Sequence, residues 1–342
     1  MSKQITISTI TPVYRGAETV RELVEKIEIQ RELLLNNNGP IRIIESIFVD
    51  DGSTDGSVLE LERLEQEYSW VKVIYLSKNF GQHPATIAGI LYSCGDWIIT
   101  LDEDLQHRPE FILSMIKKAV NDNADILYAN SDKNIHGSFF RDISSKFIKW
   151  FLSNLTGNKN MKYFNSFRLV RGSIARAASA VSIDKTYFDI ALSWFTTKIS
   201  NINLPLKDIR FIETGKSGYT IKSLFSHAGR LLQSSNVKFI RLGALIGFLA
   251  MAAGIIGSLI VLIQKMYYPE LITSDGWSSL IIGILLLGGL NAFLIGLALE
   301  KISVILMQTH GKPKFFEVDR KSDLLLKIWF EKNKLNNEAN NI

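Results

Sequence analysis

The chain has 342 residues, of which 46% are hydrophobic and 21% charged, and it carries a single cysteine. Its formal net charge of +5 comes without a long basic run or a nucleic-acid motif, which argues against a nucleic-acid partner. Because Cys94 is alone, an internal disulfide and a cysteine-based zinc site are excluded, and we expect Cys94 to be a small buried residue at a helix end. The length allows one large domain with accessory parts, or two domains.

Strand and helix patterns alternate from residue 5 to about residue 130. The predicted strands are 5–10, 41–49, 71–76, 97–101 and 126–129, and the predicted helices are 18–35, 55–68, 84–93 and 109–121. This alternation predicts an α/β fold with a mostly parallel sheet that is covered by helices on both faces. No signal peptide precedes the first strand, so we expect this part of the protein to stay in the cytosol.

The chain beyond residue 130 contains amphipathic and apolar segments. Residues 138–156 predict an amphipathic helix that either packs in a core or lies on a bilayer surface, and residues 219–241 form a second basic amphipathic stretch. Segments 242–263 and 277–299 contain no charged residue, and each is long enough to span a bilayer. Because the link between them is short, they predict a transmembrane hairpin.

Charges around these two segments predict the orientation of the hairpin. Basic residues flank its outer ends, whereas the link carries only Lys265 against Glu270 and Asp275. The positive-inside rule therefore predicts that the N-terminal domain and the tail lie in the cytosol. We expect an integral protein of a bacterial-type inner membrane. Glycines along both segments would allow close helix contact. The polar end, 332–342, is expected to be disordered.

Two acidic turns follow predicted strands, where ligands bind in sheets of this kind. Asp102 and Asp104 point to the same side if strand geometry persists, and their oxygens suit Mg²⁺ or Mn²⁺, which can neutralise a diphosphate leaving group. Asp50 and Asp51 repel each other, which costs stability unless a ligand such as a nucleobase or ribose binds there. A turn and helix cap is the alternative for Asp51.

The motifs in order resemble the inverting GT-A glycosyltransferases of the family 2 type, and within them the polyprenyl-phosphate (dolichyl-phosphate-like) glycosyltransferases. The resemblance runs through nearly the whole chain. The matching motifs are Thr11-Pro12-Val13-Tyr14, residues 48–57, residues 77–83, residues 101–110, Phe167-Arg168-Leu169, residues 215–219 and Gly311-Lys312-Pro313.

The resemblance implies a domain organisation. It comprises a Rossmann-like GT-A catalytic domain at 1–218, a juxtamembrane segment at 219–241, a transmembrane hairpin at 242–307 and a cytosolic tail at 308–342.

The resemblance also implies roles for individual residues. The nucleotide sugar would be bound by Pro12, Tyr14, Asp50, Asp51 and Asp102. The metal ligands would be Asp102 and Asp104, and these two would act in catalysis with Gln106 and Arg168. The phosphate of the lipid would meet Arg141, Lys146, Arg210 and Lys216, for which a solvated or headgroup-facing surface is the alternative. His83 and His107 are either donor contacts or structural residues.

The chain departs from the family pattern at one place. Relatives often carry an acid just before the Phe-Arg-Leu motif, where this chain has Tyr163-Phe164-Asn165-Ser166 and no carboxylate. An acceptor that is already an ionised phosphate requires no strong general base, so positioning and charge neutralisation can supply most of the rate. The departure puts in doubt a second metal contact at that place.

The function implied by the resemblance is transfer of a sugar from a nucleoside-diphosphate sugar, expected to be UDP-linked, to polyprenyl phosphate. The anomeric configuration would be inverted, and the product would serve a cell-envelope glycan or a glycan modification. One alternative is a transferase with a glycan acceptor. Its processive form would need a Gln-x-x-Arg-Trp motif and further membrane spans, and the sequence contains neither. The other is a non-catalytic membrane scaffold, against which the intact carboxylates argue. Whether the chain forms a homo-oligomer stays open.

Overall fold

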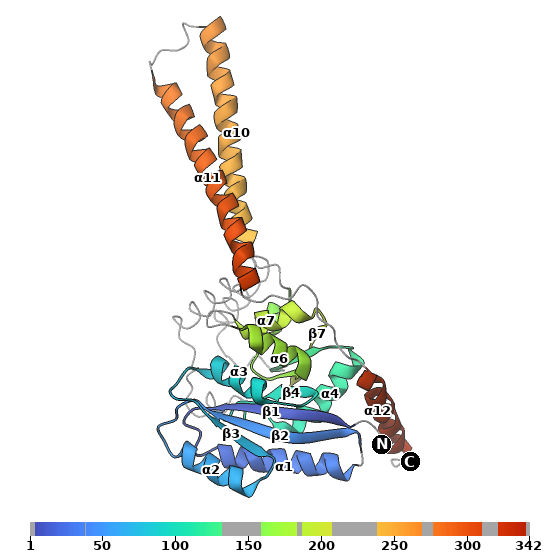
Figure 1. Ribbon diagram of the computed structural model, residues 1–342. Helices are drawn as coiled ribbons and strands as arrows, with labels where there is room; N and C mark the ends of the chain where they lie inside the picture. Colours follow the sequence, from blue (N-terminus) through green and yellow to red (C-terminus); the bar gives the residue numbers. More distant parts are fainter. Residues whose placement is uncertain are drawn as a thin grey trace. The chain divides into compact units, whose positions relative to one another are not determined.

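The computed structural model describes residues 4–37, 39–131, 159–182, 187–206, 238–268, 276–309 and 321–339. These residues fall into two compact units (Figure 1). The first unit contains the described residues up to 206 together with 321–339, and the second contains 238–268 and 276–309.

A mixed sheet of seven strands forms the centre of the first unit, in the order β3-β2-β1-β4-β6-β5-β7. The strands are β1 (Ile5–Val13), β2 (Ile41–Asp50), β3 (Val71–Tyr75), β4 (Trp97–Thr100), β5 (Ile126–Ser131), β6 (Arg168–Arg171) and β7 (Ile199–Leu204). Strand β6 is antiparallel to both of its neighbours, β4 and β5, and the other pairs are parallel. The predicted parallel core is therefore confirmed.

Helices cover both faces of this sheet. They are α1 (Val20–Asn36), α2 (Ser57–Glu67), α3 (Gln82–Tyr92), α4 (Ile112–Asn121), α6 (Gly172–Val181) and α7 (Phe188–Phe195), with short 3₁₀ turns η1 (Pro109–Phe111) and η2 (Lys159–Tyr163). One hydrophobic cluster joins α1, α2 and α4 to the sheet, and a second joins α3, α6 and α7 to it. Strand β1 contributes to both, because successive side chains point to opposite faces: Ile7 enters the first cluster and Ile10 the second.

The C-terminal segment forms a docked helix, α12 (Lys321–Ala339). The expectation that the chain is disordered from residue 332 is therefore wrong as far as Ala339. Leu326 and Phe330 of α12 belong to the core cluster on the side of α1 and α4, and Asp323 forms an ion pair of 2.5 Å with Arg171 of β6. The predicted disorder failed because it weighed the polar composition of the end and not the apolar side that precedes it.

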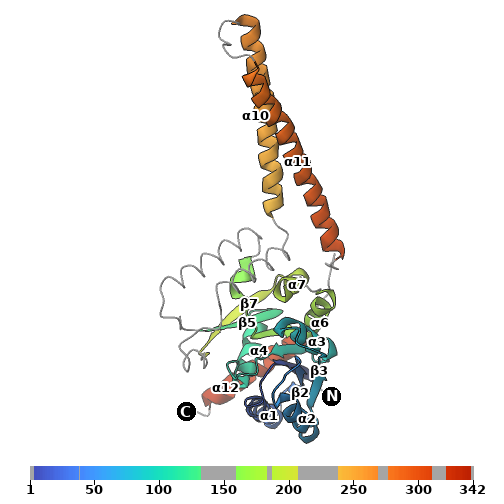
Figure 2. The ribbon, with the colours of Figure 1, turned by 90° about the vertical axis from the view of Figure 1, so that its left-hand side faces the viewer.

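The second unit is an antiparallel pair of long helices, α10 (Lys238–Tyr267) and α11 (Trp277–Thr309), which lie side by side in Figure 2. Each contains a stretch that is long and apolar enough to cross a membrane, Leu245–Tyr267 and Ile282–Leu299, with mean hydropathies of 2.6 and 2.3. Gly247 and Gly289 lie where the helices touch: a Cβ on either would come within 2.5 Å of the backbone of the other helix. Some of the glycines therefore do allow close helix contact.

Cys94 differs from its expectation, because its side chain is exposed and not buried. It follows α3 and approaches Glu45, whose carboxylate accepts the Cys94 backbone N–H at 2.7 Å. Partial desolvation raises the pKa of the Cys94 thiol, and the Glu45 carboxylate raises it further.

Candidate active site

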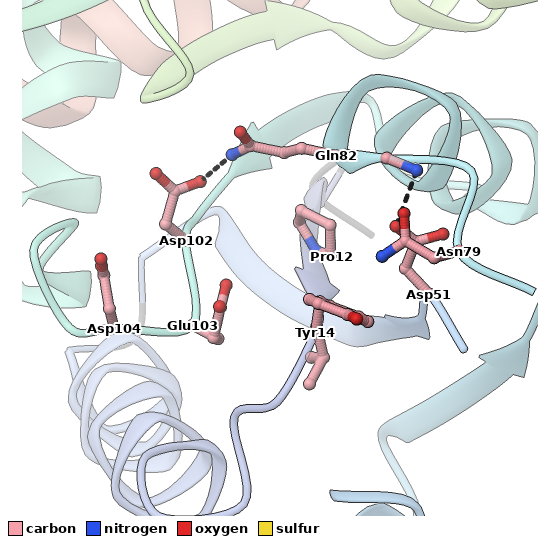
Figure 3. A pocket seen from close by; sticks show the side chains of 10 residues that line it. Pro12, Tyr14, Asp51, Asn79, Gln82, Asp102, Glu103 and Asp104 are labelled. Atoms are coloured by element: carbon pink, nitrogen blue, oxygen red, sulfur yellow. Dashed lines mark hydrogen bonds between the residues drawn. The ribbon is translucent and has the colours of Figure 1, made fainter. Parts of the chain in front are cut away.

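A cavity of about 300 Å³ opens at the carboxyl ends of β1, β2 and β4 (Figure 3). Its lining consists of Pro12, Val13, Tyr14, Asp51, Asn79, Gly81, Gln82, Asp102, Glu103 and Asp104. Asp51 and Asn79 lie at one end of the cavity, the three acids from the turn after β4 lie at the other, and Tyr14 and Pro12 lie between them. The sheet thus brings together Pro12, Tyr14, Asp51, Asp102 and Asp104, all of which the sequence had singled out.

Asp51 fixes one wall of the cavity. Its carboxylate is 2% exposed and accepts the backbone N–H groups of Phe80 at 2.7 Å and of Gly81 at 2.8 Å. Gly52 follows with φ of 68°, and a Cβ there would lie 2.7 Å from the backbone of Lys78, so a side chain would clash. The turn after β2 and the loop before α3 are consequently held against each other.

Asp50 differs from its neighbour. It is 3% exposed, does not line the cavity, and accepts the backbone N–H of Ser53 at 3.2 Å. The turn interpretation that was considered for Asp51 therefore describes Asp50.

Three uncharged groups surround Asp102. Gln82 donates its side-chain N–H to Oδ1 at 2.6 Å, and the Ser166 hydroxyl donates to Oδ2 at 3.1 Å. The backbone N–H of Asp102 donates to Nδ1 of His107 at 3.0 Å. Leu105 closes this turn with φ of 61°, a conformation that is uncommon outside glycine and often found at functional sites.

His107 supports the turn from behind. It is buried, stacks on Phe167 with ring centroids 4.6 Å apart, and its Nδ1 accepts a hydrogen bond. Burial lowers the pKa of His107, although Asp102 and Asp104 oppose this effect. Neither His107 nor His83 lines the cavity. His83 packs against Tyr187, with the two ring centroids 5.0 Å apart.

Arg168 lies outside the cavity lining, in a buried ion pair. It is 2% exposed, its guanidinium bonds the Asp189 carboxylate, and its Nε donates to the Thr100 hydroxyl at 3.3 Å. The Tyr128 hydroxyl donates to the same carboxylate at 2.8 Å. Burial alone would lower the pKa of Arg168, but the neighbouring Asp189 outweighs it and the pKa is raised. In this position Arg168 supports the end of β4 from inside the protein.

Gln106 lies next to the acidic turn but outside the cavity lining, where its backbone N–H donates to Asp104 at 3.3 Å. The residues expected to meet a lipid phosphate, Arg141, Lys146, Arg210 and Lys216, lie outside the described residues, as does the amphipathic segment 138–156.

The donor set fits a divalent cation that also binds a substrate. Within the described residues, no group of three or more His, Cys, Asp or Glu side chains is close enough to hold a metal by itself. Mg²⁺ is commonly held by one or two carboxylates together with substrate phosphates. Asp102 and Asp104 supply two such carboxylates on the cavity wall, and Glu103 also lines the cavity.

Several lining residues received no individual role from the sequence. Asn79, Gly81 and Gln82 lie in the 77–83 motif, whose place beside the acidic turns depends on the order of the strands. Glu103 was passed over because strand alternation would turn it away from Asp102 and Asp104. The turn after β4 breaks that alternation, and all three acids line the cavity.

The sheet and the acidic cavity define a GT-A type glycosyltransferase. Residues 8–181 match the sequence model of the family described as Glycosyl transferase family 2, and the chain belongs to this family.

Similar proteins cover nearly the whole chain. An uncharacterized glycosyltransferase, YkcC, of Bacillus subtilis is 27% identical over 92% of this chain and 94% of its own length. Undecaprenyl-phosphate 4-deoxy-4-formamido-L-arabinose transferase of Proteus mirabilis is 27% identical over 91% and 92%. Among solved structures, glucosyl-3-phosphoglycerate synthase of Mycobacterium tuberculosis, in complex with Mn²⁺, UDP and phosphoglyceric acid, aligns with a TM-score of 0.46 at 13% identity, over 68% of this chain and 79% of that one.

Proposed function

We propose that this glycosyltransferase moves a sugar from a nucleoside-diphosphate sugar, with UDP as the nucleotide, to polyprenyl phosphate. The observation that carries the proposal is the cavity at the strand ends, with Asp51 at one end and Asp102, Glu103 and Asp104 at the other. The name of the Proteus mirabilis relative, which is similar over most of both chains, supports a polyprenyl-phosphate acceptor. The product would serve a cell-envelope glycan or a glycan modification.

In this proposal each end of the cavity binds a different part of the donor. Tyr14 offers a ring, 40% exposed, on which a base can stack, and Asp51 and Asn79 offer polar groups for the nucleoside. Asp102 and Asp104 would hold Mg²⁺ or Mn²⁺, and such a cation stabilises the negative charge that develops on a leaving diphosphate. Since the acceptor phosphate is ionised at neutral pH, its oxygen needs orientation and not deprotonation. Gln106, beside the acidic turn, is the residue proposed to face the reacting sugar.

The helical hairpin is proposed to anchor the protein in a membrane. Both helices expose long apolar side chains along their length, as a lipid-facing helix does. The chain enters and leaves the hairpin at the same end. Both connections to the rest of the protein would therefore lie on one side of the membrane, where donor and acceptor phosphate could both be bound. We propose that this surface is cytosolic, on the charge pattern of the sequence.

The direct test is a screen of nucleotide sugars against radiolabelled polyprenyl phosphate with the full chain in membranes. We expect label in a lipid-linked sugar in the presence of Mn²⁺ or Mg²⁺, and no product when a chelator is in excess. Transfer to an added glycan with none to the lipid would favour the alternative acceptor. Failure to bind any nucleotide sugar with metal present would favour a scaffold.

The acceptor site is tested by Arg141→Glu. If Arg141 and Lys146 meet the lipid phosphate, charge reversal should raise the apparent KM for polyprenyl phosphate far more than that for the nucleotide sugar. A variant that binds the donor weakly and keeps its lipid dependence would instead assign Arg141 to the nucleotide site.

A further inference from the structure

Both carboxylate oxygens of Asp102 are engaged by side chains from distant parts of the sequence. Gln82, the first residue of α3, donates to Oδ1 at 2.6 Å, and this bond is drawn in Figure 3. Ser166, which precedes β6, donates to Oδ2 at 3.1 Å. We refer to Gln82, Asp102 and Ser166 as the Asp102 clamp. Its two donors approach the carboxylate from different parts of the chain, the start of α3 and the segment before β6.

The clamp is rigid on the side of Gln82. The preceding residue, Gly81, adopts φ of 98° and donates its backbone N–H to Asp51 at 2.8 Å. The carbonyl of Gln82 accepts the Thr86 hydroxyl at 2.8 Å. The start of α3 is therefore fixed by the opposite wall of the cavity, and Asp51 and Asp102 are coupled through two successive residues.

The clamp is also rigid on the side of Ser166. Its carbonyl accepts the hydroxyl of Thr100, which in turn accepts Nε of the buried Arg168. The adjacent Asn165 donates its side-chain N–H to the Ala129 carbonyl at 2.6 Å. The segment before β6 is thus anchored to β4 and β5, and its Ser166 hydroxyl points at Asp102.

Uncharged donors suit a metal-binding carboxylate better than cations would. An amide and a hydroxyl restrict the rotation of the carboxylate through hydrogen bonds to a charged acceptor, which are stronger than bonds between neutral groups. They leave its negative charge in place, whereas a lysine or arginine partner would cancel it. Each oxygen keeps a second lone pair for a cation. Groups that orient metal ligands in this way typically change metal affinity by about 10–100-fold.

We propose that Gln82 and Ser166 are positioning residues that hold Asp102 in the orientation in which it binds the divalent cation. Ser166 in this role orients the Asp102 carboxylate and adds no charge of its own. The inference rests on the proposed metal-dependent use of a nucleoside diphosphate.

The test measures binding and not turnover. UDP binding to the purified full chain is titrated calorimetrically with Mn²⁺ and with excess chelator, for wild type, Gln82→Met, Ser166→Ala and the double variant. We expect Mn²⁺-dependent affinity to fall about 10-fold or more in the double variant, with the chelator value and the melting temperature unchanged. Ser166→Thr keeps the hydroxyl and should restore wild-type affinity. Gln66→Met and Ser114→Ala, at exposed positions on α2 and α4, are the matched controls.

Three other outcomes would contradict the proposed role of Gln82 and Ser166. Wild-type affinity in the double variant overturns the clamp while the proposed function stands. An equal loss with chelator also overturns it, because the two residues would then contact the nucleotide and not orient the metal ligand. If wild type binds UDP no better with Mn²⁺ than without it, the proposed metal role fails, and the clamp fails with it.

Discussion

At the scale of single residues, the structure separates side chains that face the cavity from those that support it. Asp102 and Asp104 line the cavity, while Arg168 lies behind β4 and pairs with Asp189. A buried arginine that is matched by one carboxylate cannot also be presented to a substrate without an uncompensated charge. Arg168 is instead linked to Asp102 on the cavity wall through Thr100 and Ser166.

The first prediction concerns Asp104. Asp104→Asn should lower turnover at least about 100-fold, because a neutral amide holds a hard cation poorly and the lost charge stabilisation is worth several kcal/mol. The variant should keep the melting temperature of wild type without metal, since the change lies on a cavity wall. Lipid-linked product formation is the measurement. Full activity of the variant, or of wild type in excess chelator, would exclude the metal role.

At the scale of elements, α12 is part of the first unit although it follows the hairpin in sequence. The first unit contains the candidate active site and is called the catalytic unit below. Arg171 of β6 bonds Asp125 at 2.6 Å and Asp323 of α12 at 2.5 Å, and its guanidinium lies 4.5 Å from the centre of the Trp97 ring. Trp329 covers Gly39, where a Cβ would lie 2.5 Å from the indole. The contact combines a buried charge cluster with apolar packing.

The second prediction tests this docking with two leucines of the same helix. Leu326 is fully buried and Leu324 is 65% exposed. Leu326→Ala should lower the stability of the catalytic unit by about 2–5 kcal/mol, because the deletion leaves a cavity in the core. Leu324→Ala should change it by less than about 0.5 kcal/mol. Thermal unfolding in detergent measures both, and equal effects of the two changes would show that α12 does not dock in solution.

The third prediction concerns the hairpin and compares two adjacent glycines. A Cβ on Gly289 would lie 2.5 Å from the backbone of Met251 in α10, whereas at Gly288 it would meet nothing within 4 Å. Gly289→Ile should therefore force the helices apart and lower the thermal stability of the hairpin, while Gly288→Ile should be tolerated. Disulfide cross-linking between cysteines placed across α10 and α11 reports the separation. Equal cross-linking in both variants would argue against this packing.

At the scale of the whole molecule, the chain passes from the catalytic unit into the hairpin and returns to it through α12. The catalytic unit is thus connected to the hairpin on both sides by covalent chain. This connection follows from the order of elements alone.

The fourth prediction tests the orientation in the membrane. In sealed cells, an impermeant maleimide should label a cysteine placed at residue 274, in the link, and should not label Cys94 until the cells are lysed. Cys94 suits this comparison because it is exposed in the catalytic unit and is the one cysteine of the sequence. Labelling of Cys94 from outside would place the catalytic unit on the other side and overturn the cytosolic donor.

The sequence by itself determined the alternating α/β core, the two apolar helices and the acidic turns. These features follow from local periodicity and from carboxylates placed directly after strands, so neighbouring residues suffice to predict them. The order of motifs also determined the family. The short strands β6 and β7 and the docking of α12 escaped prediction, because their stability comes from partners far away in sequence, such as Asp323 for Arg171.

Only the tertiary structure decided which of the singled-out residues reach the cavity. Adjacent aspartates looked alike in sequence, yet Asp51 lines the cavity and Asp50 closes a turn. Gln82 can bond Asp102 because the start of α3 lies next to the end of β4. The strand order of the sheet brings these two segments together. Burial and hydrogen bonding depend on contacts between segments that are distant in sequence. Local sequence patterns therefore could not predict them.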